Sequence, residues 1–167
     1  MSSVIIKLLT FNTNYHIILE HYLLGGVLMD KFKEIRPITL GIVVKDGKIL
    51  ASRGYDKIKN SHFYRCLGGG IEFMEKSDAT LKREFMEEID AEVTVGDFLG
   101  VSENIFTFNG QTGHELILLY SVAINDDCYK EMYFIEGNKE HVVEWIDIDK
   151  VKSGEILLYP IEVLKYL

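Results

Sequence analysis

The chain has 167 residues, a formal net charge of −8 and 47% hydrophobic residues. This length is sufficient for one domain that buries a core without disulfides or a structural metal. The negative charge argues against general binding to nucleic-acid backbones, which is typical of proteins with a basic face. It does not exclude phosphate ligands, because a divalent cation can bridge an acidic site and a phosphate.

Two cysteines, Cys66 and Cys128, lie far apart and belong to no CxxC or Cys/His cluster. We expect them to be reduced thiols, and we therefore expect the protein to be cytoplasmic.

The first 28 residues are unusually apolar, at residues 4–9 and 17–29, but polar residues interrupt both stretches. Neither stretch reaches the ~18–20 apolar residues of a membrane span. The basic start and small-residue cleavage site of a secretory signal are missing as well. We predict no membrane association, and an N-terminal extension over residues 1–28, helical or poorly ordered, ahead of a domain over residues 29–167. The alternative is a start-site artefact, with Met29 as the natural beginning.

The first part of the domain is rich in strand signals. Residues 38–44 and 48–51 contain many Ile, Val and Leu residues and flank Asp46-Gly47, so they predict a β-hairpin with a tight turn. Residues 56–61 are polar and predict a loop. Residues 63–67 predict a short strand that ends at three consecutive glycines.

Residues 77–89 predict a helix, because Leu81, Phe85 and Ile89 recur at i, i+4 and i+8 and Ser77 or Asp78 can cap its start.

The second part of the domain again predicts mainly strands, at residues 93–101, 105–108, 116–124 and 142–146. Asn109-Gly110 and Thr112-Gly113 predict turns, and Pro160 is expected to open a short terminal helix. Strands on both sides of one helix predict an α+β fold, a sandwich in which helices cover a mixed β-sheet.

The predicted helix carries three carboxylates on one face, because Glu84, Glu87 and Glu88 stand at i, i+3 and i+4. Like charges so placed destabilise an isolated helix by roughly 0.2–0.5 kcal/mol per pair. Oxygen-only clusters suit hard cations such as Mg²⁺ or Mn²⁺. Solvated helix faces rich in Glu are common, however, so the three carboxylates alone do not establish a metal site.

Gly68, Gly69 and Gly70 follow a predicted strand and lead through a short loop into the acidic helix. Glycines allow the backbone to approach a phosphate or metal closely. A glycine triplet alone can be an ordinary turn. A glycine turn directed at an acidic helix is more specific, because a metal–diphosphate needs both parts.

The segment from Gly69 to Ala91 resembles the Nudix (MutT-like) box, a pattern of one glycine, one arginine and several glutamates at fixed spacing. Seven residues are in register with that pattern: Gly69, Glu75, Arg83, Glu84, Phe85, Glu87 and Glu88. Asp90 stands where the pattern has Gly, at a helix end that requires a left-handed conformation, which Asp tolerates at a modest penalty.

The resemblance implies a Nudix-like α/β/α sandwich and Mg²⁺-dependent hydrolysis of a nucleoside diphosphate linked to another group, with Mn²⁺ as a substitute. Expected metal ligands are Glu84, Glu87 and Glu88 and a backbone carbonyl of Gly68 or Gly69. Arg83 is expected to orient Glu87, and Glu75 to be structural, favoured by the helix dipole. Candidate substrate contacts are Arg65, Gly69, Gly70 and Glu72.

Three glutamates are candidates for the general base. Glu84 lies within the box, and Glu115 and Glu140 are expected on downstream loops. Each of the two loop glutamates is explained equally simply as an ordinary solvated residue at a strand end, without a catalytic role.

Two other functions stay open: a nucleotide sensor without turnover, and an RNA 5′-end pyrophosphohydrolase. The complete set of box carboxylates favours an enzyme over a sensor, and the net charge of −8 disfavours an RNA substrate. The expected partner is a small nucleotide whose identity the sequence leaves open. A homodimer formed through the N-terminal extension is a further hypothesis.

Overall fold

The computed structural model describes residues 34–124, 132–136 and 139–167. The predicted extension over residues 1–28 and Cys128 lie outside this range, so the proposed domain limits stay a prediction. None of the helices in the described part is long and apolar enough to cross a membrane.

One sheet has the strand order β1-β6-β5, with β1 (Ile35–Ile42) parallel to β6 (Gln111–Ile124) and β5 (Val93–Phe108) antiparallel to it. The two strands predicted at 93–101 and 105–108 are thus one long strand. Asn109-Gly110 forms the predicted turn between β5 and β6. The turn predicted at Thr112-Gly113 is wrong, because both residues lie within β6 and pair with β5.

The other sheet has the order β7-β8-β3-β4-β9, and β2 pairs with β3. Its strands are β2 (Val44–Lys45), β3 (Lys48–Asp56), β4 (Ser61–Arg65), β7 (Met132–Glu136), β8 (Lys139–Asp147) and β9 (Leu158–Tyr159). The predicted loop at 56–61 is confirmed as the connection between β3 and β4. β7 and β9 had no equivalent among the predicted strands.

The predicted hairpin over 38–44 and 48–51 is only partly right. Its turn at Asp46-Gly47 is present, but only β2 pairs with β3, whereas β1 pairs with the distant strand β6. Ile38 and Leu40 are fully buried. An apolar strand can pair equally well with a distant parallel strand or with the other strand of a hairpin. The local sequence pattern therefore could not identify β6 as the partner of β1.

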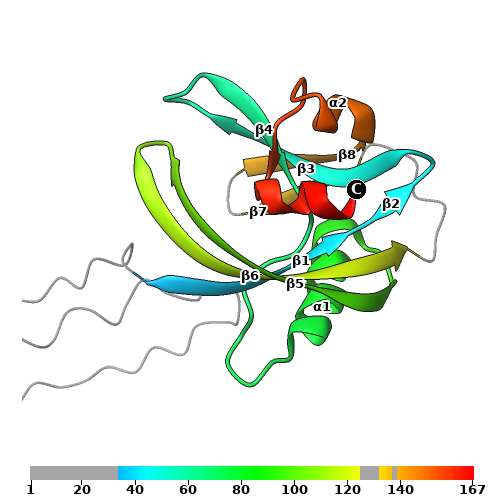
Figure 1. The fold of residues 1–167 in the computed structure, drawn as a ribbon. Coiled ribbons are helices and arrows are strands. Elements are labelled where there is room, and N and C mark those ends of the chain that lie inside the picture. The colour runs from blue at the N-terminus through cyan, green and yellow to red at the C-terminus, as the bar shows by residue number, and fades with distance from the viewer. Residues whose placement is uncertain (1–33, 125–131, 137–138) are drawn as a thin grey trace, which may run out of the picture. The chain divides into compact units, whose positions relative to one another are not determined.

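The segment after β4 joins the two sheets. Thr39 N donates to Gly69 O and Gly41 N donates to Leu67 O, each at 2.9 Å, and Ile38 and Gly70 form an antiparallel bridge. Residues 67–71 therefore run beside β1, and the two sheets continue into one strongly curled mixed sheet (Figure 1).

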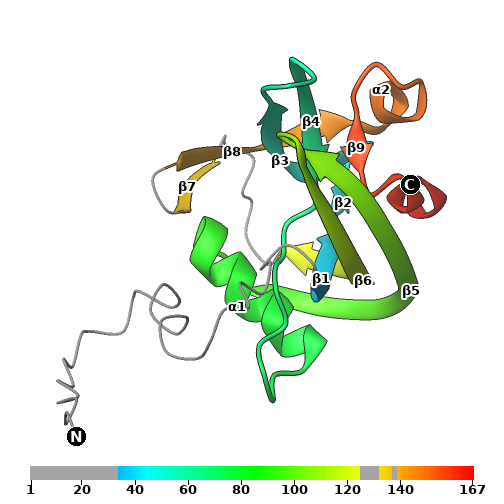
Figure 2. The same ribbon diagram turned by 90° about the vertical axis from the view of Figure 1, so that its left-hand side faces the viewer.

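Helix α1 (Ser77–Ile89) covers one side of the curled sheet, and α2 (Ile148–Lys152) with the 3₁₀ helix η1 (Ile161–Tyr166) lies on the other (Figures 1 and 2). The predicted α/β/α sandwich and the predicted helix over 77–89 are thus confirmed. The terminal helix expected near Pro160 is η1, with Pro160 at its N-cap. Helix α2, which was not predicted, begins where the Asp147 side chain accepts hydrogen bonds from the amides of Asp149 and Lys150.

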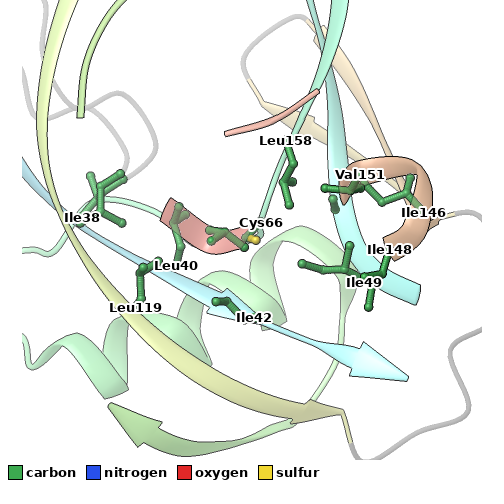
Figure 3. Close-up of a cluster of buried hydrophobic side chains, with 13 residues drawn as sticks. Ile38, Leu40, Ile42, Ile49, Cys66, Leu119, Ile146, Ile148, Val151 and Leu158 are labelled. Atoms are coloured by element: carbon green, nitrogen blue, oxygen red, sulfur yellow. The ribbon is translucent and has the colours of Figure 1, made fainter. Parts of the chain in front are cut away.

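Two apolar cores separate these layers. The core under α1 contains Leu81 and Phe85 with side chains of both sheets, and Gly41 allows Phe85 to pack directly on β1, since a Cβ there would lie 2.9 Å from its ring. The core under α2 and η1 appears in Figure 3 and includes Ile38, Leu40, Ile42, Ile49, Cys66, Leu119, Ile146, Ile148, Val151 and Leu158. Burial raises the pKa of the Cys66 thiol to about 12, so this thiol stays protonated and unreactive.

The tips of two hairpins are tied together. The buried side chain of Asp56, the last residue of β3, accepts hydrogen bonds from the amides of Ile58, Lys59 and Asn109. The Lys57 amide donates back to Asn109 Oδ1 at 2.8 Å. These bonds hold the β3–β4 hairpin against the β5–β6 hairpin and bring β4 opposite β5 and β6.

Candidate active site

Helix α1 ends as the sequence predicts. Asp90 adopts the left-handed conformation, with φ 52° and ψ 42°, at the C-cap. Its amide donates to Met86 O at 3.1 Å, and the Ala91 amide donates to Phe85 O at 3.4 Å. The helix stops here because these bonds satisfy its last carbonyls.

Arg83 is the centre of a hydrogen-bond network around the start of α1. Its Nε and Nη2 donate to the two carboxylate oxygens of Glu75, each at 2.9 Å. Its Nη1 donates to Glu84 at 2.8 Å and to Glu87 at 3.2 Å, and Nη2 also donates to Gly70 O at 3.2 Å. The predicted contact with Glu87 is present, but Glu75, held at two points, is the main partner of Arg83.

Glu75 makes specific hydrogen bonds in addition to the favourable helix-dipole position that the sequence suggested. The hydrogen bonds from Arg83, assisted by the Thr80 hydroxyl and the Glu72 amide, hold the pKa of Glu75 at about 2. The same pairing raises the pKa of the Arg83 guanidinium. Both groups are therefore charged throughout the physiological pH range and fix the loop between Gly70 and α1.

The glycine turn meets two of the helix carboxylates. A Cβ on Gly69 would lie 2.3 Å from Glu84 Oε1, so the Gly69 backbone lies directly against that carboxylate. The Gly68 amide is 3.3 Å from Glu88 Oε2 and donates to it. Gly68 has φ 128°, and a Cβ there would lie 2.3 Å from Thr39 O, so this position requires glycine.

The donor set matches a hard divalent cation in its chemistry, because it consists of carboxylate and backbone carbonyl oxygens. Because Gly69 has no side chain, the Glu84 carboxylate occupies space beside the backbone that a Cβ at position 69 would fill. Within residues 34–124, 132–136 and 139–167, however, no three His, Cys, Asp or Glu side chains are arranged to hold an ion. Arg83 Nη1 engages Glu84 Oε1 and Glu87 Oε2, and Glu87 is 60% exposed, so the arginine holds one oxygen of each carboxylate in this arrangement.

Two of the candidate residues, Arg65 and Glu115, lie away from the Arg83 network and contact each other. Arg65 Nη2 donates to Glu115 Oε2 at 3.0 Å, and Glu115 is only 1% exposed. The expectation of a solvated loop position for Glu115 is wrong, because it lies within β6. Its alternation with the buried Ile117 and Leu119 was the sequence feature that could have indicated this.

The remaining candidates are placed as follows. Glu140 lies in β8 rather than on a loop and pairs with Ile135, and its side chain is outside the described range. The amide of Glu72 donates to Glu75 Oε2 at 3.3 Å, which places Glu72 in the tight turn ahead of α1.

A family model described as the NUDIX domain matches residues 35–165. The chain belongs to the NUDIX family. It is therefore a hydrolase that acts on pyrophosphate bonds, and such hydrolases generally use divalent cations.

Solved structures show the same NUDIX fold at low sequence identity. A NUDIX-family hydrolase from Clostridium perfringens has a TM-score of 0.57 at 15% identity, over 80% of this chain and 93% of the other. The ORF135 protein of E. coli has a TM-score of 0.56 at 19% identity, over 79% and 87%. A MutT NUDIX hydrolase from Burkholderia pseudomallei has 0.54 at 22% identity, over 70% and 86%. No curated protein matches the sequence of this NUDIX hydrolase.

Proposed function

We propose that this NUDIX hydrolase uses Mg²⁺ to cleave a phosphoanhydride bond in a nucleoside diphosphate linked to another moiety. The observation that carries the proposal is the contact of the glycine turn with two helix carboxylates, Gly69 with Glu84 and Gly68 with Glu88. An anionic diphosphate approaches an acidic helix only with cations between them, and the bare backbone at Gly69 leaves room for that approach.

Glu84 and Glu88 would hold the cation, with Glu87 as a further ligand and a backbone carbonyl of the glycine turn beside them. When bound, the cation would neutralise the phosphoryl oxygens and lower the pKa of a bound water. Gly69 O already accepts a hydrogen bond from Thr39 N at 2.9 Å, which fixes the direction of this carbonyl and leaves its second lone pair for another partner.

Arg83 keeps the carboxylates in place without being a ligand. It donates to Glu84 and is itself held at two points by Glu75, so the pair sets the position of Glu84 at the glycine turn. We assign the general base to Glu84 rather than Glu115, because Glu84 lies against Gly69 whereas Glu115 is buried beside Arg65.

A screen of nucleoside diphosphate derivatives, with the cleaved products separated and identified by ion-exchange chromatography, tests the proposal. The screen includes nucleoside triphosphates, ADP-ribose, dinucleoside polyphosphates and nucleotide sugars, each with Mg²⁺, with Mn²⁺ or with EDTA. We expect turnover of one compound class with Mg²⁺, and none with EDTA. Nucleotide binding without turnover of any compound by the folded protein would support the sensor alternative.

A further inference from the structure

Strand β5 lies at the edge of its sheet, and among the described residues it pairs with β6 alone. The turn Asn109-Gly110 closes a two-residue hairpin, and both turn residues have positive φ, 49° and 80°. In such a hairpin the closing pair, Phe108 and Gln111, exchanges hydrogen bonds, and so does every second pair before it. The alternate residues of β5 direct their backbone N–H and C=O groups away from β6, toward the edge: Val101, Glu103, Ile105 and Thr107.

Side chains from other elements cap both ends of this edge. Lys59 Nζ donates to Thr107 O at 2.6 Å, which agrees with the outward direction of that carbonyl. The Tyr166 hydroxyl donates to Leu99 O at 2.9 Å. Between the two caps, the outward backbone groups of residues 101–105 have no partner in the part of the chain that the structure describes. We call residues 101–105 the open edge.

The open edge lacks the features that usually prevent an edge strand from pairing. Such strands carry lysine, proline or a bulge. Residues 99–108 contain neither lysine nor proline, and the register shifts of β5 lie between Val95 and Gly100, outside the open edge. Val101 is 62% exposed and Ile105 is 71% exposed. A regular, exposed and apolar edge of this kind is a template for a further strand.

A second copy of the same edge fits this template, because an antiparallel copy is complementary to it. With Glu103 on the twofold axis, Val101 lies opposite the second copy's Ile105, and each outward N–H meets an outward C=O. A shift of two residues in either direction would place Val101 opposite the capped Thr107, or Ile105 opposite the capped Leu99. The caps therefore select the register centred on Glu103.

The side chains on the outer face agree with this register. Val101 and Ile105 form two β-branched cross-strand pairs, which stabilise a sheet. The two Glu103 carboxylates on the axis would repel each other if they lay side by side. Each is instead directed toward β6, because His114 Nε2 lies 2.9 Å from Glu103 Oε1.

We propose that two copies of this hydrolase associate through residues 101–105 of β5, antiparallel about a twofold axis at Glu103. The two three-stranded sheets then join into one continuous sheet. The interface uses the outward backbone groups of β5 and leaves the glycine turn and α1 unchanged.

Sedimentation velocity of the full chain over a wide concentration range tests the association. We expect a species of twice the chain mass of 19.2 kDa at high concentration. Ile105→Lys should weaken the association by about tenfold or more, because each dimer then carries two lysines within its edge contact. Leu116→Lys is the matched control, because Leu116 pairs with Glu103, lies on the same outer face and is 38% exposed, but is one strand away from the edge. It should leave the association unchanged.

A cysteine on the axis tests the register. Residues opposite each other in a hydrogen-bonded antiparallel pair have Cα atoms about 5.5 Å apart, a separation that a disulfide spans. Under mild oxidation, Glu103→Cys should therefore form a covalent dimer. Thr107→Cys, on the same edge but at the Lys59 cap, should not exceed the wild-type protein, which supplies the baseline for Cys66 and Cys128.

A monomer at every concentration would overturn the proposal. So would an Ile105→Lys protein that associates as tightly as the wild type, or a Leu116→Lys protein that is weakened equally, because another surface would then hold the dimer. Melting temperatures show whether each variant is folded. If Ile105→Lys does not fold, the two cysteine variants decide, and equal cross-linking of both would overturn the register and the proposal with it.

Discussion

Arg83 and Glu75 form a two-point ion pair across eight residues, with Nε–Oε1 and Nη2–Oε2 distances of 2.9 Å each. The pair ties the loop after the glycine turn to the middle of α1. Because Arg83 also donates to Glu84 at 2.8 Å, Glu75 acts on the carboxylate at Gly69 through Arg83. Glu75 is thus a positioning residue.

Replacing Glu75 by Gln should lower the free energy of unfolding at neutral pH by about 1–2 kcal/mol, because two hydrogen bonds to a charged acceptor are weakened. The pKa of Glu75 is about 2 in the folded protein against an ordinary 4.5, so the stabilisation is present above pH 4.5. It is lost as pH falls from 4.5 toward 2. Urea denaturation between pH 2 and 7 measures this, and the Glu75→Gln protein should show a shallower acid dependence.

The control for this variant is Glu103→Gln, whose carboxylate is 62% exposed and, among the residues that the structure describes, pairs only with His114. Its stability at pH 7 should stay within about 0.5 kcal/mol of the wild type. If the two variants have the same acid dependence as the wild type, the two-point ion pair does not stabilise the fold.

The three adjacent glycines should respond differently to alanine. Gly68→Ala should destabilise the protein by several kcal/mol, because φ is 128° and the Cβ would lie 2.3 Å from the Thr39 carbonyl. Gly69→Ala should leave thermal stability nearly intact but lower turnover, because the Cβ would displace the flexible Glu84 carboxylate at 2.3 Å. Gly70→Ala should change stability little, because nothing lies within 4 Å of a Cβ there.

Thermal melting and the rate of substrate cleavage, measured on the three variants, separate these effects. A Gly69→Ala protein with unchanged turnover would show that the position of Glu84 against Gly69 is unimportant for catalysis.

Replacing Asp90 by Gly should stabilise the protein by about 0.5–1 kcal/mol, since a left-handed residue with a Cβ is strained by about 1–2 kcal/mol and the added chain entropy offsets part of the gain. Asp90 has φ 52°, and its side chain is exposed. Asp90→Ala removes the carboxylate but retains the strain, so only the glycine variant should melt at a higher temperature. Equal melting temperatures for Asp90→Gly and Asp90→Ala would contradict this explanation.

Local patterns predicted the elements whose partners are close in the sequence. The helix over 77–89 followed from the spacing of Leu81, Phe85 and Ile89, and its left-handed end followed from Asp90. The pairing of β1 with β6 was not predictable, because Thr39 and its hydrogen-bond partner Leu118 are 79 residues apart. Local apolar composition carries no information about which distant strand pairs.

The site was predictable in its residue types but not in its connections. The sequence indicated that Gly69, Glu84 and Glu88 belong together, and the structure brings all three to the glycine turn. The pairing of Arg83 with Glu75 depends on how the loop between them turns back.

We propose that the carboxylates at the glycine turn bind the divalent cation used in hydrolysis. Mn²⁺ binding, measured by electron paramagnetic resonance beside the rate of substrate cleavage, tests this most directly in the Glu84→Gln and Glu88→Gln proteins. The exposed Glu92, just beyond α1, provides the control Glu92→Gln. We expect each helix variant to weaken Mn²⁺ binding by about tenfold or more and to lose turnover, with the control unchanged. Unchanged Mn²⁺ binding in both helix variants would show that the cation is held elsewhere and would contradict this account of the site.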